Sequence, residues 1–82
     1  MSYVYIIQSH KTGRYYVGAT RDLQRRIKEH NAGKSSTKRD APFELVYAEE
    51  HVSMKAAVRR EAMIKSYKSG NAFKKLLAKD DK

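Results

Sequence analysis

The fold of this chain is decided by two strand-like stretches, Tyr3-Val4-Tyr5-Ile6-Ile7-Gln8 and Tyr15-Tyr16-Val17-Gly18-Ala19, with the turn His10-Lys11-Thr12-Gly13 between them. Both stretches are rich in β-branched and aromatic residues, a composition that predicts β-strands. Gly13 can adopt the positive φ that a tight turn requires. The sequence therefore predicts an N-terminal β-hairpin.

Capping residues predict three helices after the hairpin. Thr20 is a candidate N-cap for a first helix that ends at Gly33. Ser53 can cap a second helix that runs to about Lys68. Asn71 can cap a short third helix, because Ser and Gly residues directly before it break the second one.

A third strand is predicted between the first two helices, over residues 43–49. Here Phe43, Leu45 and Tyr47 alternate with the residues of the opposite face. The predicted order is therefore β-β-α-β-α-α. A hairpin at the start and no βαβ repeat predict an α+β fold, a small three-stranded and largely antiparallel sheet flanked by helices.

Composition favours a single small domain that binds a polyanion. The 82 residues leave room for one core, so we expect one domain over residues 1–82. Lys and Arg number 18 against 9 Asp and Glu, a net charge of +9 that favours nucleic acid as the partner. An anionic membrane is the rival partner, but the apolar helix face that it requires is provided only weakly by Phe73, Leu76 and Leu77.

Some classes of site are excluded by what the chain lacks. It has no cysteine, which excludes disulfides and cysteine-based zinc sites. It has no apolar run of membrane-spanning length, and Met1-Ser2-Tyr3 leads directly into a strand-like segment instead of a signal peptide. We therefore expect a cytoplasmic protein without a membrane partner.

Glu61 is a carboxylate on the apolar side of the second predicted helix. At about 100° per residue it falls within an apolar arc. The arc consists of Met54, Ala57, Val58, Ala62 and Ile64. A charge that faces the protein without a partner is costly. An ion pair with Lys65, one turn further on, is one explanation, and a metal ion bound by Glu61 is the other; periodicity alone does not choose between them.

Arg26 and His30 are four residues apart on the first predicted helix and therefore share a face. Arg26 follows Leu23 by three residues, which places it beside the apolar stripe, at the margin between core and surface. Each residue alone also has an ordinary interpretation, as a surface arginine and as a histidine that packs near a helix end. Arg25 points elsewhere, as a solvated or phosphate-contacting cation.

The predicted loop after the first helix is polar and basic. It can offer cations and hydroxyls to a phosphate backbone, although a solvated loop has the same composition. The candidate nucleic-acid-binding residues of this loop are Lys34, Thr37, Lys38 and Arg39.

Tyr5 and Tyr16 stand out among the six tyrosines because they lie on adjacent strands of the hairpin, close to Gly18. A glycine within a strand weakens it unless something approaches the backbone closely. A substrate phosphate or a helix end would both qualify. Packing roles suit the other tyrosines, Tyr3, Tyr15, Tyr47 and Tyr67.

In this order, these residues resemble the GIY-YIG endonuclease superfamily, and the similarity extends from about Tyr3 to Leu77. The two half-motifs match at Val4-Tyr5-Ile6 and Tyr16-Val17-Gly18. The segments around Arg26, Leu45-Val46-Tyr47 and Glu61 are similar to the family's first helix, third strand and metal-binding helix. The chain is most similar to small, stand-alone bacterial members. It departs from the pattern at Tyr3, where the name-giving motif has glycine, and at Ala19, where some relatives carry lysine.

The resemblance implies a three-stranded sheet flanked by helices and divalent-metal-dependent cleavage of nucleic acid. It also implies the site residues. These are the active-site tyrosines Tyr5 and Tyr16 with Gly18 packed beside them, the catalytic Arg26, His30 at a further active-site position, and Glu61 as the metal ligand.

For the chemistry, we expect Glu61 to hold Mg²⁺ or Mn²⁺ and Arg26 to clamp the phosphate. Tyr5 is the candidate general base, with Tyr16 orienting the water or a phosphate oxygen. Ionising a free phenol at pH 7 costs about 4 kcal/mol, so either nearby cations lower the pKa of Tyr5 or it passes its proton to His30.

Three functions remain open at this level. The first is an endonuclease of low sequence specificity that acts on DNA, single-stranded or branched DNA included, in repair, recombination or turnover. The second is a catalytically degenerate module that binds nucleic acid without cutting it. The third is a structural or interaction module with a basic surface.

Overall fold

The computed structural model, which describes residues 1–32, 41–67 and 70–79, contains one antiparallel sheet and three helices. The strands are β1 (Ser2–Ser9), β2 (Tyr15–Thr20) and β3 (Phe43–His51), in the spatial order β2-β1-β3. The helices are α1 (Leu23–Asn31), α2 (Met54–Lys65) and α3 (Asn71–Lys79). The predicted α+β class and the order β-β-α-β-α-α are therefore confirmed.

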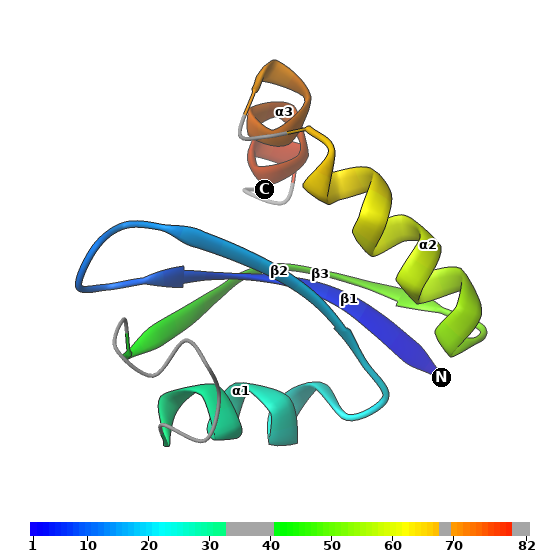
Figure 1. The fold of residues 1–82 in the computed structure, drawn as a ribbon, viewed down its shortest axis with the longest axis horizontal. Coiled ribbons are helices and arrows are strands. Elements are labelled where there is room, and N and C mark those ends of the chain that lie inside the picture. Colours follow the sequence, from blue (N-terminus) through cyan, green and yellow to red (C-terminus); the bar gives the residue numbers. More distant parts are fainter. Residues whose placement is uncertain (33–40, 68–69, 80–82) are drawn as a thin grey trace.

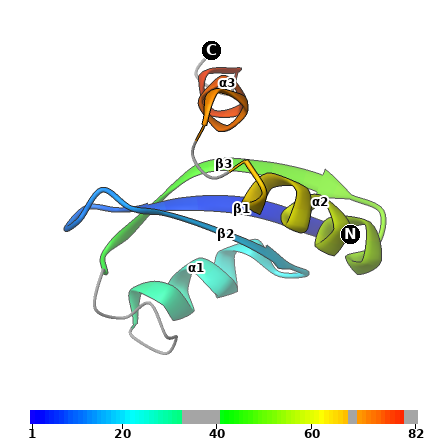
Figure 2. The ribbon, with the colours of Figure 1, turned by 45° about the horizontal axis from the view of Figure 1, so that its top comes forward.

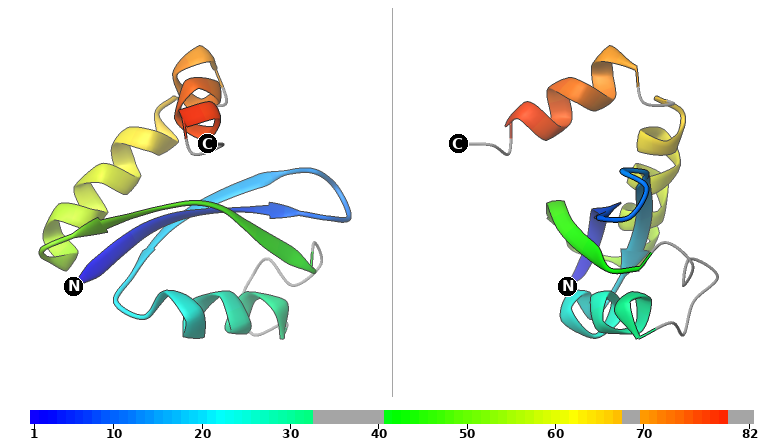
Figure 3. Two further views of the ribbon diagram at one scale, coloured as in Figure 1. Left: turned by 180° about the vertical axis from the view of Figure 1, so that it is seen from behind. Right: turned by 90° about the vertical axis from the view of Figure 1, so that its left-hand side faces the viewer.

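The sheet is the middle of three layers. Helix α1 lies against one face, and α2 and α3 lie on the other (Figure 1). Figure 2 and the two further views in Figure 3 also show α1 and α3 on opposite sides of the sheet. As the central strand, β1 is covered on both sides, which is why Val4, Ile6 and Ile7 have no exposed surface.

Each face of the sheet has its own apolar core. On the α2 and α3 side the buried residues are Val4, Ile6, Ala57, Ile64 and Phe73. On the α1 side they are Tyr5, Ile7 and Phe43, with Leu23 and Ile27 packed against them. The apolar face of α3, including Leu76 and Leu77, packs against the first of these cores. Within the described ranges, no helix has the length and apolar character needed to cross a membrane.

The hairpin register brings the two candidate tyrosines to the same face. Tyr5 lies opposite Gly18, and Ile7 lies opposite Tyr16. Because side chains two positions apart along a strand share a face, Tyr5 and Tyr16 both belong to the face that α1 covers. Gly13 in the connecting turn has a φ of 79°, as predicted for a position that favours glycine.

Helix boundaries depart from the prediction at several places. The N-cap of α1 is Asp22, whose side chain accepts a hydrogen bond from the Arg25 backbone N–H at 3.1 Å, and not Thr20. Ser53 caps α2 as predicted, but α2 ends at Lys65 instead of near Lys68. Helix α3 begins at Asn71 itself. Helix α1 ends at Asn31; the predicted stop at Gly33 lies outside the described residues.

Asn31 fixes the end of α1 to the start of β3. Its Oδ1 accepts a hydrogen bond from the Phe43 backbone N–H at 2.6 Å, and its Nδ2 donates to the Phe43 carbonyl. The contact joins the two ends of the connection between α1 and β3. It therefore helps to hold α1, and the residues it carries, in a defined place below the sheet.

The predicted alternation along the third strand is wrong after Leu45. Ile7 pairs with Leu45 but Ile6 pairs with Tyr47, so Val46 is an extra residue at a β-bulge. The bulge moves Tyr47 to the opposite face from Phe43, where it packs against the core below α2 and α3. A one-residue insertion of this kind reverses every later side chain, and alternation in the sequence does not reveal it.

The buried face of α2 is also narrower than the predicted arc. Ala57 and Ile64 are fully or almost fully buried, whereas Val58 is 48 % exposed and Ala62 is exposed. Glu61 lies four residues after Ala57 and three before Ile64. It therefore lies at the margin of the buried face and not at its centre, and this is a position from which a carboxylate can reach a cleft.

A polar cluster on the β3 side holds α2 in this orientation. The Glu49 carboxylate on β3 lies 2.8 Å from Nε of Arg60 and 2.8 Å from Nε2 of His51, and it accepts a hydrogen bond from the Tyr47 hydroxyl. Burial and Glu49 raise the pKa of Tyr47 to about 12, so its hydroxyl stays a donor. Because Arg60 is tied to β3, its neighbour Glu61 is directed toward the other side of the helix.

Candidate active site

A cleft of about 360 Å³ opens at the β2 edge of the sheet, where residues of α1 and α2 meet from opposite faces. Its lining comes from four elements, as Tyr5, Tyr16, Val17, Gly18, Ala19, Arg26, His30, Glu61 and Lys65. The structure thus brings together all five residues predicted to be catalytic. Glu61 reaches the cleft from α2, although it is distant in sequence from the other four.

Gly18 allows the Tyr5 side chain to cross β2. A Cβ added at Gly18 would overlap the hydroxyl, Cζ and Cε2 of Tyr5, the farthest of these at 2.9 Å. The close approach to Gly18 is therefore made by the tyrosine ring, not by a helix end. Only glycine leaves this space, and as a result the Tyr5 hydroxyl extends over the edge strand into the cleft.

The Tyr5 hydroxyl meets His30 inside the cleft. Its oxygen lies 3.1 Å from Nε2 of His30, and the two rings pack edge to face with centroids 5.9 Å apart. Both residues are nearly fully buried, with 3 % and 5 % of their surfaces exposed. This phenol–imidazole contact has the geometry needed for the proton transfer that the sequence suggested as one of two alternatives.

The electrostatics of the cleft disfavour direct ionisation of Tyr5. Burial raises the pKa of Tyr5 above 10, even though the Arg26 guanidinium beside it and Lys65 act to lower it. Burial, followed by the charge of Arg26, lowers the pKa of His30 below 6.5. At neutral pH the phenol therefore keeps its proton and the imidazole is neutral, so Nε2 of His30 can accept a hydrogen bond from the Tyr5 hydroxyl in the tautomer that carries its proton on Nδ1.

Arg26 lies at the margin between core and surface, as predicted, with 37 % of its side chain exposed. Its NH1 group donates to Oε1 of Glu29 at 3.1 Å, one helical turn further along α1. Its charge also acts on Tyr5 and His30. Arg26 is thus a cation inside the cleft whose planar guanidinium suits a phosphate group.

Glu61 and Lys65 form an ion pair, with Nζ of Lys65 2.8 Å from Oε2 of Glu61. Only 20 % of the Glu61 side chain is exposed, compared with 57 % for Lys65. The helix ion pair considered from the sequence is therefore present, and the same carboxylate lines the cleft. The ion pair with Lys65 therefore does not exclude a metal ion at Glu61.

The donor set of the cleft fits a hard divalent cation that is held mainly by water and substrate. Among the described residues, Glu61 is the acidic residue that lines the cleft, and no cluster of three or more His, Cys, Asp or Glu could enclose an ion. Mg²⁺ is commonly bound through one or two carboxylates plus water and phosphate oxygens. Of the residues that the structure describes, Glu61 would therefore hold the ion, and water would fill the remaining coordination positions.

The buried neutral state of His30 predicts a loss of stability in mild acid. Below pH 6.5 the unfolded chain takes up a proton on this imidazole, whereas the folded chain, with a lower pKa, does not. Protons then favour the unfolded state, so the thermal midpoint should fall as the pH is lowered from 7 to 5.

Thermal melts of wild type, His30→Gln and His10→Gln measure this effect. In His30→Gln the decrease of the thermal midpoint between pH 7 and 5 should be much smaller than in the wild type. His10→Gln replaces an exposed histidine outside the cleft, so its thermal midpoint should decrease as in the wild type. The same fall in wild type and His30→Gln would mean that the imidazole is not held neutral by its burial.

The remaining predicted residues lie elsewhere. Arg25 lies outside this cleft, where Nε pairs with Oε2 of Glu29 at 3.3 Å. The loop residues Lys34, Thr37, Lys38 and Arg39 lie outside the described part of the chain. Lys65, which the sequence predicts only as a partner for Glu61, also lines the cleft; its spacing of four from Glu61 is the signal that could have identified it.

Comparison with known proteins agrees with this geometry. Residues 1–75 match the family described as the GIY-YIG catalytic domain, and the chain belongs to this family. Membership supports an endonuclease-type function that acts on nucleic acid.

More specifically, the chain is similar to UPF0213 proteins. It is 36 % identical to one from Streptococcus pneumoniae over 69 residues, which is 82 % of this chain and 69 % of the relative. It is 43 % identical to one from Halobacterium salinarum over 67 residues, 79 % of this chain and 86 % of the relative. The solution NMR structure of the UPF0213 protein BH0048 from Bacillus halodurans matches 95 % of this chain and 84 % of that one, with a TM-score of 0.60 and 37 % identity.

Proposed function

We propose that this protein is a divalent-metal-dependent endonuclease that hydrolyses phosphodiester bonds in DNA with low sequence specificity. The observation that carries the proposal is that Tyr5, Arg26 and Glu61, from three different elements, open into one cleft. Hydrolysis requires a positioned water, a proton acceptor, and stabilisation of the charge that develops on the phosphate. The cleft offers a group for each of these tasks.

The proton moves along the contact between Tyr5 and His30. The attacking water gives a proton to the Tyr5 oxygen as the phenol gives its own proton to Nε2 of His30, 3.1 Å away. No free phenolate forms, which suits a tyrosine whose pKa is raised by burial. Tyr16, which lines the same cleft, orients the water or a phosphate oxygen.

The phosphate is held by charge. Arg26 donates to its non-bridging oxygens through the planar guanidinium. A Mg²⁺ or Mn²⁺ ion at Glu61, when bound, would supply Lewis-acid stabilisation of the charge on the phosphate and leaving oxygens. Lys65 balances the Glu61 carboxylate at 2.8 Å and keeps it from repelling the substrate.

Binding to nucleic acid is mainly electrostatic. The net charge of +9 attracts the phosphate backbone, and the groups named above contact phosphate and not base edges. With about six phosphates contacted, the logarithm of the affinity should fall against the logarithm of salt with a slope of roughly −4 to −5. Such binding suits a role in repair, recombination or turnover, where the target is a DNA structure and not one sequence.

A binding module without cleavage is the second candidate, and the ion pair between Glu61 and Lys65 favours it. A neutralised carboxylate can line a nucleic-acid-binding cleft without repelling phosphate, so the pair would also suit a protein that only binds.

Incubation of the wild type with single-stranded, duplex and branched DNA, in Mg²⁺ or Mn²⁺ and in EDTA, tests the proposal. We expect cleavage of at least one substrate with metal and none in EDTA, measured on denaturing gels. Binding to all three without cleavage of any would establish the second candidate instead.

A further inference from the structure

A second hollow, of about 480 Å³, adjoins the cleft. The two share Ala19 and Arg26 in their linings, so they lie side by side near the β2 edge and the start of α1. A DNA strand that places one phosphate against Arg26 therefore continues into the second hollow in one of its two directions.

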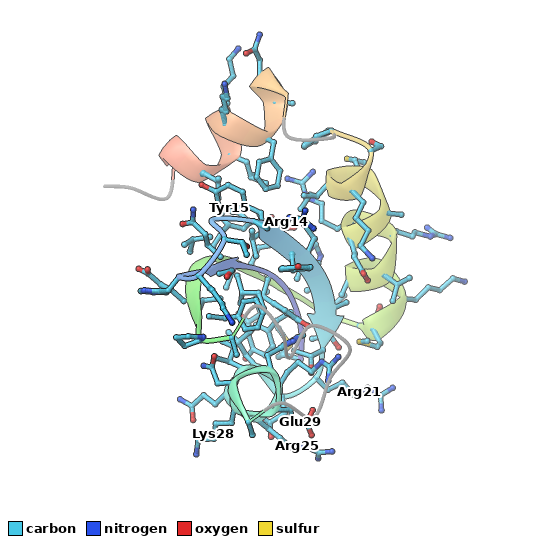
Figure 4. The ribbon with its side chains drawn as sticks, turned by 60° about the vertical axis from the view of Figure 1, so that its left-hand side comes forward. Arg14, Tyr15, Arg21, Arg25, Lys28 and Glu29 are labelled. Atoms are coloured by element: carbon cyan, nitrogen blue, oxygen red, sulfur yellow. The ribbon has the colours of Figure 1, made fainter. Side chains whose placement is uncertain are left out.

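The second hollow contains a cation without an ionic partner. Arg21 and Arg25 line it together with Arg26. Within the described ranges Arg21 forms no ion pair, whereas Arg25 pairs with Glu29. Arg21, Arg25 and Glu29 lie on one side of α1 (Figure 4).

The two acidic residues of this hollow are already engaged within the protein. Asp22 is the N-cap of α1 and accepts the Arg25 backbone N–H. Glu29 lies between two guanidinium groups, with Oε2 3.3 Å from Nε of Arg25 and Oε1 3.1 Å from NH1 of Arg26. An anion held by two arginines is the arrangement that a phosphate group would also adopt.

We propose that this second hollow binds the backbone phosphate next to the scissile one through Arg21 and Arg25, and that Glu29 occupies the anion position beside Arg25 until DNA enters. The proposal rests on the proposed function, because it assumes that a strand lies against Arg26. On binding, the phosphate replaces Glu29 as the partner of Arg25. Arg26 is thereby released from Glu29 toward the scissile phosphate.

Replacement of Glu29 and replacement of Arg21 should have opposite effects on the affinity for DNA. Glu29→Gln removes the internal anion but keeps the shape of the side chain and its suitability for a helix. It should tighten DNA binding by about 5-fold at low salt, because removal of the carboxylate also removes its repulsion of the phosphate, an effect that added salt screens. Arg21→Gln removes a phosphate contact and should weaken binding by about 5-fold.

Arg59 provides the matched control. It is an exposed arginine on α2 that lines neither hollow, so Arg59→Gln removes the same charge from a different place. Any effect of net charge alone is then common to Arg21→Gln and Arg59→Gln. The difference between the two variants reports the local contact.

The experiment measures the affinity of the full chain for a fluorescein-labelled single-stranded oligothymidylate by anisotropy in EDTA, over a series of salt concentrations. Arg21→Gln should reduce the magnitude of the salt slope by about 0.7, the value for one phosphate contact on a single strand, and Arg59→Gln should leave it unchanged. Equal slopes and affinities for Arg21→Gln and Arg59→Gln, or weaker binding by Glu29→Gln, would overturn the proposal.

The affinity measured in EDTA tests the phosphate site independently of the proposed nuclease activity. The measurement in EDTA requires binding only, so the subsite can be established even if the wild type proves unable to cut DNA. Conversely, a wild type that cuts while Arg21→Gln binds like Arg59→Gln refutes the subsite alone. Circular dichroism of each variant confirms that the comparison is between folded proteins.

Discussion

Glu61→Gln should lower the rate of DNA cleavage by at least about 10³-fold, or ~4 kcal/mol of transition-state stabilisation, because it removes the carboxylate that would hold the metal ion. The side chain keeps its size, and the lost pair with Lys65 is partly exposed, so the fold should remain stable. Binding in EDTA should be retained or slightly tighter, since a negative charge has left the cleft. Single-turnover cleavage and anisotropy, measured on the same preparation, separate the two effects.

Glu50→Gln is the control for this variant. Glu50 is an exposed glutamate on β3 that does not line the cleft, so its replacement removes the same charge and should leave the rate unchanged. Equal cleavage by wild type and Glu61→Gln would show that the activity does not depend on this carboxylate, as with a contaminating nuclease. Equal loss in both variants would trace the effect to net charge.

Tyr5→Phe should reduce cleavage by about 10²- to 10⁴-fold, the range that general acid–base groups contribute. The ring that packs over Gly18 is kept, and only the hydroxyl that contacts Nε2 of His30 is lost. Stability should fall by only ~1 kcal/mol, for one buried hydrogen bond. The measurement is single-turnover cleavage at saturating protein, with thermal melts to report stability.

Tyr15 and Tyr16, on the second strand of the hairpin, provide comparison variants for Tyr5→Phe. Tyr15→Phe removes a hydroxyl outside the cleft, next to Phe73, and should cleave like the wild type. Tyr16→Phe should lose activity, but less than Tyr5→Phe, if Tyr16 only orients the water. A wild-type rate for Tyr5→Phe together with a large loss for Tyr16→Phe would exchange the roles of the two residues.

Local patterns predicted most of the fold. The hairpin followed from two β-rich stretches and a glycine turn, and the N-terminus of α2 followed from Ser53, because these signals act over a few residues. Where two residues compete for one local role, such a pattern is ambiguous. Thr20 and Asp22 can both cap α1, and the structure uses Asp22.

Contacts between distant segments decided what the patterns missed. The bulge at Val46 moves Tyr47 to the other face of the sheet, and the Glu49–Arg60 pair sets the rotation of α2. Periodicity alone had placed Val58 in the apolar arc, yet it is half exposed. Both features depend on how β3 pairs with β1 and how α2 packs on the sheet.

For the chemistry of the cleft as well, some features followed from the sequence and others only from the tertiary structure. The residue types, their order along the chain and the basic charge were all present in the sequence, and the family resemblance that they carry implied which five side chains would meet. The proton path from Tyr5 to His30, the place of Lys65 and the hollow beside Arg21 emerged only when α1 and α2 were positioned on opposite faces of one sheet. The partners of Glu29 lie three and four residues before it on the same helix, so helical spacing alone provides them. Distances and burial across the cleft depend on the packing of the helices on the sheet, and they set the pKa of Tyr5.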